Sequence, residues 1–119
     1  MDALKALQIE LAAFAADRDW DKFHTPKNLA MALSGEAGEL LERFQWLTPE
    51  QSELGMLSSD TLQGIEEEMA DVLLYLLRLA DRLNVNLEAA ASAKLQRNAV
   101  KYPVEKAKGN AVKYSRRGE

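Results

Sequence analysis

Two pairs of acidic residues, three positions apart in each pair, are the feature of this sequence that points most directly to chemistry. Glu36 and Glu39 form one pair, and Glu68 and Asp71 form the other. Residues three apart on a helix have Cβ atoms about 5–6 Å apart, so each pair can direct two carboxylates at one point. Each pair also flanks an apolar helical face. We therefore expect the four carboxylates to converge where the two helices pack.

Converging carboxylates need either protons or a cation. Two unit charges 4 Å apart repel by about 4 kcal/mol at an effective dielectric of 20. A site made only of oxygen ligands favours Mg²⁺ or Mn²⁺ over zinc. A di-iron site in a helical bundle would need Glu-x-x-His on two helices, and the only histidine, His24, lies in a predicted loop. The alternative is that these are solvated surface acids.

The composition predicts one all-α domain. Among 119 residues there are 19 leucines and 18 alanines, against five valines, two isoleucines and three threonines, which are too few β-branched residues for a sheet. Cysteine is absent, which suits a reducing cytoplasm, where we expect the protein to work. The longest apolar run, residues 72–77, is too short to cross a membrane, and the first residues show no signal-peptide pattern.

Four helices are expected to position the acidic pairs. The first covers about residues 2–17. The second opens at Thr25-Pro26 and runs to about Trp46, and the third covers about residues 61–83 with Asp60 as its cap. Asn86 caps the fourth, which must end before Tyr102-Pro103 because the residue preceding proline avoids helical angles. Residues 103–119 are predicted to form a largely irregular tail.

The third helix is unusually apolar. Its apolar residues cover about 160° of its circumference, which is wider than a surface helix of a small bundle needs. This width favours burial against a second subunit, and the alternative is a central helix within a monomer.

Charge is divided unevenly along the chain. Residues 1–93 hold seven basic and 17 acidic side chains, whereas residues 94–119 hold eight basic and two acidic ones. The acidic body argues against broad nucleic-acid binding. The basic end is better suited to a phosphorylated ligand or to an acidic protein surface.

Four segments of the chain resemble one known family. They are "RDWDKFHTPKNL", "GEAGELLERFQW", "EEMADVLLYLLRLA" and "KYPVEKAKGNAVKY". Together with the Glu-x-x-Glu and Glu-x-x-Asp pairs they are similar to the MazG-like all-α nucleoside triphosphate pyrophosphohydrolases, in the dCTP pyrophosphatase branch. The resemblance implies a four-helix MazG-like domain over residues 1–102, a basic tail over residues 103–119, and a tetramer built as a dimer of dimers.

The resemblance also implies an activity and its residues. A nucleoside triphosphate would be hydrolysed to the monophosphate and pyrophosphate with Mg²⁺, and Glu39 is our choice of general base. Glu36, Glu39, Glu68 and Asp71 would hold the metal. The phosphates would meet Lys94, Asn98 and Tyr102, which recur every four residues, with Lys113 and Tyr114 as further contacts from the tail.

The nucleobase needs an aromatic pocket, because aromatic faces can sandwich a base. The predicted pocket residues are Trp20, His24, Trp46 and Tyr75. Each of them has an alternative place in the core, and Trp20 and Trp46 are favoured for the pocket because they adjoin loops. The sequence departs from the family pattern at Leu11, where some relatives carry a polar pocket residue.

Three functions remain open at this point. The first is hydrolysis of dCTP or a modified dCTP in nucleotide-pool house-cleaning. The second keeps the fold but acts on another triphosphate, such as dUTP or dATP. The third is a non-catalytic helical oligomerisation module whose acids bind metal or a basic partner.

Overall fold

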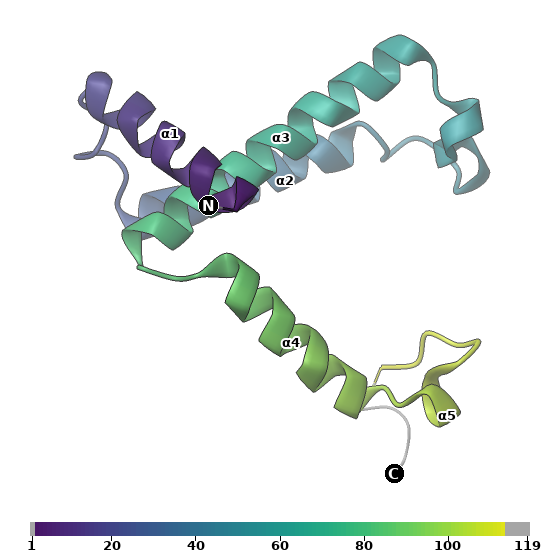
Figure 1. Cartoon of the computed structure of the whole chain (residues 1–119). Coiled ribbons are helices and arrows are strands. Elements are labelled where there is room, and N and C mark those ends of the chain that lie inside the picture. Colours follow the sequence, from purple (N-terminus) through teal and green to yellow (C-terminus); the bar gives the residue numbers. More distant parts are fainter. Residues whose placement is uncertain (1, 114–119) are drawn as a thin grey trace. The chain divides into compact units, whose positions relative to one another are not determined.

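A computed structural model describes residues 2–113 and shows helices joined by short loops (Figure 1). The α-helices are α1 (Ala3–Asp17), α2 (Pro26–Glu42), α3 (Ser59–Arg82), α4 (Leu87–Lys101) and α5 (Val104–Ala107). Two short 3₁₀ turns, η1 (Glu50–Ser52) and η2 (Leu54–Met56), connect α2 to α3. No strand occurs within the described range, so the predicted all-α class is confirmed.

Within the described residues, the chain divides into two compact units, one that ends at Val85 and one that begins at Asn86. The first unit contains α1, α2 and α3, and the second contains α4 and α5.

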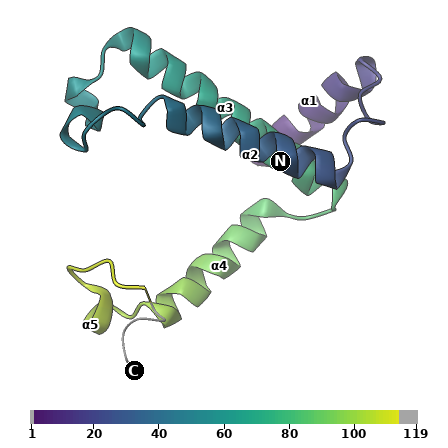
Figure 2. The same ribbon diagram turned by 180° about the vertical axis from the view of Figure 1, so that it is seen from behind.

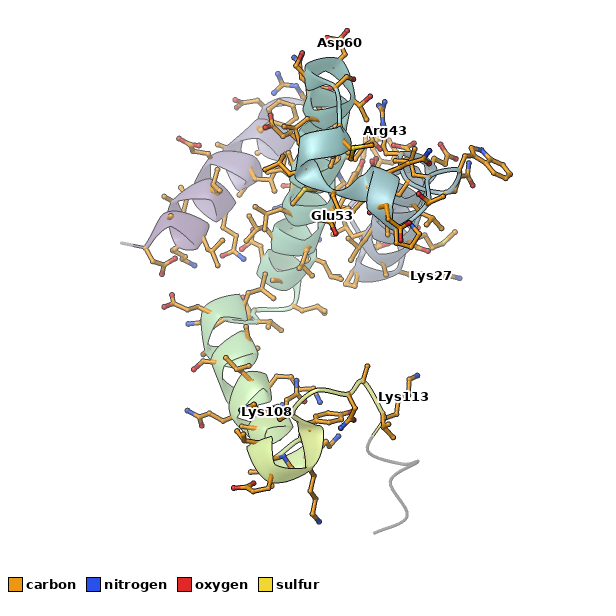
Figure 3. The ribbon with its side chains drawn as sticks, turned by 90° about the vertical axis from the view of Figure 1, so that its right-hand side faces the viewer. Lys27, Arg43, Glu53, Asp60, Lys108 and Lys113 are labelled. Carbon is orange, nitrogen blue, oxygen red and sulfur yellow. The ribbon has the colours of Figure 1, made fainter. Side chains whose placement is uncertain are left out.

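In the first unit, α3 lies between α1 and α2. The helices α2 and α3 run side by side in opposite directions, and α1 crosses the other side of α3 (Figures 1 and 2). The side view in Figure 3 shows the same order of the three helices. Leu29 of α2 and Leu77 of α3 are the largest fully buried side chains, and Ala15 of α1 is also fully buried. This central position accounts for much of the wide apolar face of α3.

Part of that face remains open in the single chain. Met69 of α3 is 57% exposed, and Leu83, which follows α3 as its C-cap, is 53% exposed. Neither α1 nor α2 covers them fully within the first unit.

Two of the predicted helix boundaries are confirmed by their capping hydrogen bonds. The Thr25 side chain accepts a hydrogen bond from the backbone N–H of Asn28, with Pro26 at the first helical position. The Asn86 side chain likewise accepts from the N–H of Ala89, at 3.0 Å.

Two other boundaries differ from the prediction. Ser58, not Asp60, caps α3, because its hydroxyl accepts from the N–H of Thr61 and the helix therefore starts earlier. Helix α2 ends at Glu42 rather than at Trp46. The N–H groups of Arg43 and Phe44 bond to carbonyls three residues back, so the chain tightens into turns.

The second unit begins with α4, which ends before Tyr102-Pro103 as predicted. The tail is not wholly irregular, because α5 forms a single turn in which the N–H of Lys106 bonds to the carbonyl of Pro103. The predicted phosphate contact Tyr114 lies outside the described residues. None of the helices in residues 2–113 is long and apolar enough to cross a membrane.

Candidate active site

Packing of α2 against α3 brings three of the predicted metal ligands together. One carboxylate oxygen from each of Glu36, Glu39 and Glu68 can be chosen so that all three lie within 4.8 Å of one another. Glu36 follows Leu29 by seven positions and Glu68 follows Ile65 by three, so each glutamate lies on the packing side of its own helix. The apolar stripe that holds the helices together therefore also carries carboxylates to the contact.

Two oxygens in this acidic cluster are buried without a partner. Oε2 of Glu36 and Oε2 of Glu68 receive no hydrogen bond from any described residue. Burial raises the pKa of Glu36 to about 7, with further contributions from its hydrogen bond with Glu39 and from the charges of Glu39, Asp71 and Glu68. The cluster therefore tends to retain a proton when no cation is bound.

Arg43 supplies a positive charge at one side of the acidic cluster. Its Nη2 lies 3.5 Å from Oε1 of Glu68, and the Arg43 side chain is 43% exposed. The guanidinium rests directly over Gly64 of α3, where a Cβ would lie 2.7 Å from Nη1. Figure 3 shows Arg43 beside α3. Glycine at position 64 thus leaves the space through which Arg43 reaches Glu68.

A cavity of about 230 Å³ opens beside the cluster, between α1, the following loop and α3. It is lined by three of the predicted base-contacting residues, Trp20, His24 and Tyr75, together with Asp71. Its further lining residues are Leu11, Phe14, Leu74 and Arg78. Asp71 is outside the group of three close carboxylates, but its charge contributes to the raised pKa of Glu36. It therefore connects the acidic cluster with the aromatic cavity.

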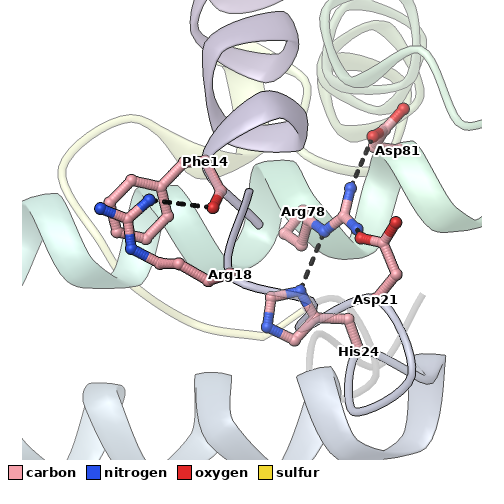
Figure 4. Close-up of polar contacts among 6 residues, drawn as sticks. All are labelled: Phe14, Arg18, Asp21, His24, Arg78 and Asp81. Atoms are coloured by element: carbon pink, nitrogen blue, oxygen red, sulfur yellow. Dashed lines mark hydrogen bonds and ion pairs between the residues drawn. The ribbon is translucent and has the colours of Figure 1, made fainter. Parts of the chain in front are cut away.

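The aromatic rings form a continuous wall of this cavity. Phe14 and Trp20 meet edge to face with ring centroids 5.7 Å apart, and Trp20 meets His24 in the same manner at 6.1 Å. Outside the wall, the guanidinium of Arg18 lies 3.6 Å from the centre of the Phe14 ring and donates to the Phe14 carbonyl (Figure 4). These contacts fix the ring planes before any ligand arrives.

Arg78 is a charged residue of the cavity that was not among the predicted site residues. It is only 5% exposed, and it contacts Asp21, His24 and Asp81 (Figure 4). The available signal was its spacing: Arg78 follows Asp71 by seven positions and Leu74 by four, so it belongs to the same helical face. An arginine on such a face needs partners because a buried charge is costly when unpaired.

The remaining predicted residues comprise one residue of the first unit and four of the second. Trp46 is 87% exposed in the turns after α2. Lys94, Asn98, Tyr102 and Lys113 belong to the second unit. Asn98 is half-buried there, and its carbonyl accepts from the N–H of Tyr102 at 2.8 Å.

The acidic cluster fits a hard divalent cation. Its donors are all carboxylate oxygens, which Mg²⁺ prefers, and a bound cation would satisfy the two buried oxygens that lack partners. The same cation would offset the repulsion that otherwise favours protonation of Glu36.

Comparison with known proteins gives concordant matches. The sequence profile of the MazG-like family matches residues 31–116. The chain is 44% identical to dCTP pyrophosphatase 1 of Bos taurus over 104 residues, which are 87% of this chain and 62% of that protein. It is 43% identical to dCTP pyrophosphatase 1 of Homo sapiens over 87% of this chain and 61% of that protein. The chain thus spans about three-fifths of the length of these relatives.

A solved structure is also similar to this chain, and the match covers nearly all of that structure's length. The crystal structure of a pyrophosphatase from Archaeoglobus fulgidus is similar with a TM-score of 0.79 and 42% sequence identity, over 87% of this chain and 94% of that one. The family profile covers well over half of the chain and the residues of the acidic cluster fall within it. The chain belongs to the MazG-like family.

Proposed function

We propose that this protein is a Mg²⁺-dependent nucleoside triphosphate pyrophosphohydrolase that converts dCTP, or a modified dCTP, to the monophosphate and pyrophosphate. The observation that carries the proposal is the acidic cluster with two unpartnered buried oxygens beside an aromatic cavity. The names of the relatives, dCTP pyrophosphatase 1 and a pyrophosphatase, support both the reaction and the substrate class. The activity would serve nucleotide-pool house-cleaning in the cytoplasm.

Glu36, Glu39 and Glu68, joined by Asp71, would hold Mg²⁺ in this proposal. When bound, the ion neutralises phosphate oxygens and makes water a better nucleophile at neutral pH. Glu39 is the exposed member of the acidic cluster, whereas Glu36 and Glu68 are half-buried. We therefore assign Glu39 as the general base, because it can reach a water molecule at the edge of the cluster and accept its proton.

The cavity would hold the nucleobase and sugar. Trp20 provides an aromatic edge and face in the wall, and Tyr75 follows Asp71 by one helical turn, so a base stacked there would lie next to the carboxylates. Leu11 contributes an apolar side chain to the same cavity. An apolar surface at this position tolerates an added methyl group, so modified dCTP is included in the proposal.

The triphosphate group of the substrate also needs contacts outside the cavity. The phosphates would be contacted by Lys94, Asn98, Tyr102 and Lys113. The hydrolase domain would comprise residues 1–102, and residues 103–119 would form a basic tail.

We also propose a homotetramer built as a dimer of dimers, because exposed apolar side chains are frequent in the first unit: Met31 is 63%, Leu41 62%, Trp46 87% and Met69 57% exposed. Trp46 would complete the base pocket of a neighbouring subunit.

A panel of triphosphates assayed for pyrophosphate release with Mg²⁺ tests the function. We expect dCTP or 5-methyl-dCTP to show the highest kcat/KM. A higher value for dUTP or dATP would keep the reaction and change the substrate. Absence of pyrophosphate release from every triphosphate would contradict the proposal and leave a non-catalytic oligomerisation module.

A further inference from the structure

We propose that Arg78 is a positioning residue that fixes His24 as a neutral imidazole with its proton on Nε2, which then donates a hydrogen bond to an acceptor atom of the nucleobase. The identity of the ligand rests on the proposed function. The state of the histidine ring does not, and it can be measured in the free protein.

Each of the three guanidinium nitrogens of Arg78 has a hydrogen-bond partner. Nε donates to Nδ1 of His24 at 3.0 Å, Nη1 donates to Oδ2 of Asp81 at 3.0 Å, and Nη2 donates to Oδ1 of Asp21 at 2.6 Å (Figure 4). The Arg78 side chain is 5% exposed, so these contacts replace water. The two carboxylates fix the plane of the guanidinium, and the plane fixes the direction of the Nε–H bond.

This hydrogen bond determines where the His24 ring carries its proton. A guanidinium stays protonated in proteins and has no acceptor, so Nδ1 of His24 must offer its lone pair. Nδ1 is therefore unprotonated, and the ring proton lies on Nε2. Burial lowers the pKa of His24, and Arg78 lowers it further, while Asp21 acts in the opposite direction. The neutral ring is the form that the hydrogen bond from Arg78 requires and that burial favours.

The Nε2–H group is available to a ligand. His24 lines the cavity with Trp20 and Asp71, and no described residue accepts a hydrogen bond from Nε2. The lining also includes Phe14, Leu74 and Tyr75, together with Arg78, whose guanidinium nitrogens already donate to other residues. In such a wall a single fixed donor is a polar contact that can orient a flat base.

The partner of this donor is a neutral acceptor, not a phosphate. The Asp71 carboxylate lines the same cavity and would repel a phosphate group, and Arg78, the cation in the lining, is already paired with Asp21 and Asp81. A carbonyl oxygen or an unprotonated ring nitrogen of a base can accept the hydrogen bond from Nε2–H of His24 without being repelled as a phosphate would be. His24 also cannot take up a proton at Nδ1 without losing the bond from Arg78, which excludes it as the general base.

The ring state can be read directly because His24 is the only histidine of the chain. A long-range ¹H–¹⁵N correlation spectrum of the uniformly ¹⁵N-labelled full chain at neutral pH contains one imidazole. We expect an unprotonated Nδ1 and a protonated Nε2. A proton on Nδ1, on both nitrogens, or averaged between them in the free protein would overturn the proposal without bearing on the hydrolase activity.

A pair of arginine variants separates the hydrogen bond from the charge. Arg78→Met should shift both ring nitrogens toward the averaged values of a free imidazole. Arg82→Met removes an exposed charge one helical turn further along α3 and should leave the ring as in the wild type. Equal changes in both variants would show that charge alone sets the ring state. If Arg78→Met does not fold, the wild-type spectrum still decides the tautomer.

The role of the donor is tested with base analogues bound in the presence of Ca²⁺, which slows turnover. The probes are dCTP, its 3-deaza analogue, which lacks the ring-nitrogen acceptor, and its 2-thio analogue, whose acceptor is weak. Wild type should bind one of the two analogues about ten- to a hundredfold more weakly than dCTP, because a buried donor is left unpaired. His24→Phe should lose that discrimination. Equal discrimination in both proteins would overturn the proposed contact, whereas failure of dCTP to bind at all would overturn the proposed function and leave the tautomer result standing.

Discussion

The guanidinium of Arg43 lies on the backbone of Gly64, so closely that a methyl group at position 64 would come within 2.7 Å of Nη1 and 2.8 Å of Cζ. The same guanidinium reaches Glu68 at 3.5 Å. The glycine therefore leaves room for a positive charge next to the acidic cluster, where it would compete with the proposed metal ion for Glu68.

Gly64→Ala should displace Arg43 and raise the affinity for Mg²⁺ by a small factor, because Glu68 loses a competing cation. The factor is small because a partly exposed ion pair is worth about 0–1 kcal/mol. Alanine also has a higher helix propensity than glycine, by up to about 1 kcal/mol. This gain offsets the loss of the Arg43 contact, so the melting temperature should change little. Calorimetric titration with Mg²⁺ measures the effect.

Gly38→Ala is the matched control, because a Cβ there meets no atom within 4 Å. It should change helix propensity without changing Mg²⁺ affinity. If Gly64→Ala and Gly38→Ala bind Mg²⁺ equally, Arg43 does not modulate the acidic cluster.

Stability of the metal-free protein should fall as the pH rises from about 4.5 to about 7, in part because of Glu36. Burial raises the pKa of this side chain from 4.5 to about 7 in the folded state. The folded protein then binds more protons than the unfolded chain over this interval, so the contribution of Glu36 is complete below pH 4.5 and is lost as the pH rises through 7. Melting temperatures across this pH range measure the slope.

Glu36→Gln should flatten that slope, while Glu42→Gln on the exposed side of α2 should keep it. Saturating Mg²⁺ should also flatten it, because the cation stabilises the ionised cluster. A Glu36→Gln protein with the wild-type slope would show that Glu36 does not hold the proton.

Trp46→Ala should cost little stability in the single chain, because the indole is 87% exposed. A buried tryptophan would cost roughly 3–5 kcal/mol on the same truncation. If the indole stacks on a base in a neighbouring subunit, KM for the triphosphate should rise while Mg²⁺ affinity stays constant. A large loss of melting temperature, or an unchanged KM, would refute the proposed role.

Lys113→Ala should weaken binding of triphosphate more than binding of monophosphate, because the proposed contact is made to the outer phosphates. Lys108→Ala, at the end of α5 and also labelled in Figure 3, serves as the control and should have little effect. The difference should shrink at high salt, since exposed charges are screened over about 8–10 Å. Calorimetry with Ca²⁺ gives both affinities, and an unchanged ratio between them removes the phosphate contact.

The sequence was informative where a residue's role follows from its own helix. Residue spacing alone placed Glu36 and Glu68 on the sides of their helices that pack together. Asn86 could be identified as a cap because a capping hydrogen bond joins residues only three positions apart. The cap of α3 was misassigned because Ser58 and Asp60 are both good capping residues, and only the hydrogen bond to Thr61 distinguishes them.

Contacts between distant segments were not accessible from the sequence. The bond between Arg78 and His24 joins residues 54 positions apart, and the contact between Arg43 and Glu68 joins residues 25 positions apart. The central position of α3 also depends on how α1 and α2 pack against it. Periodicity gave the width of its apolar face but not which neighbours cover it.

The carboxylates of the acidic cluster should be required for turnover but not for folding. Glu39→Gln removes the proposed general base and a metal ligand, and general base catalysis alone typically contributes 10²–10⁴-fold. Glu42→Gln, three positions along the same helix and outside the group of three close carboxylates, should retain activity. Circular dichroism should be unchanged in both variants.

Identification of the products formed from dCTP tests the central claim most directly. Phosphorus NMR of a reaction with Mg²⁺ should show dCMP and pyrophosphate appearing together. When Mg²⁺ is chelated, or when Glu39→Gln replaces the wild type, the dCTP signals should persist without the product signals. Release of dCDP and inorganic phosphate, or equal turnover in the Glu39→Gln protein, would contradict the account.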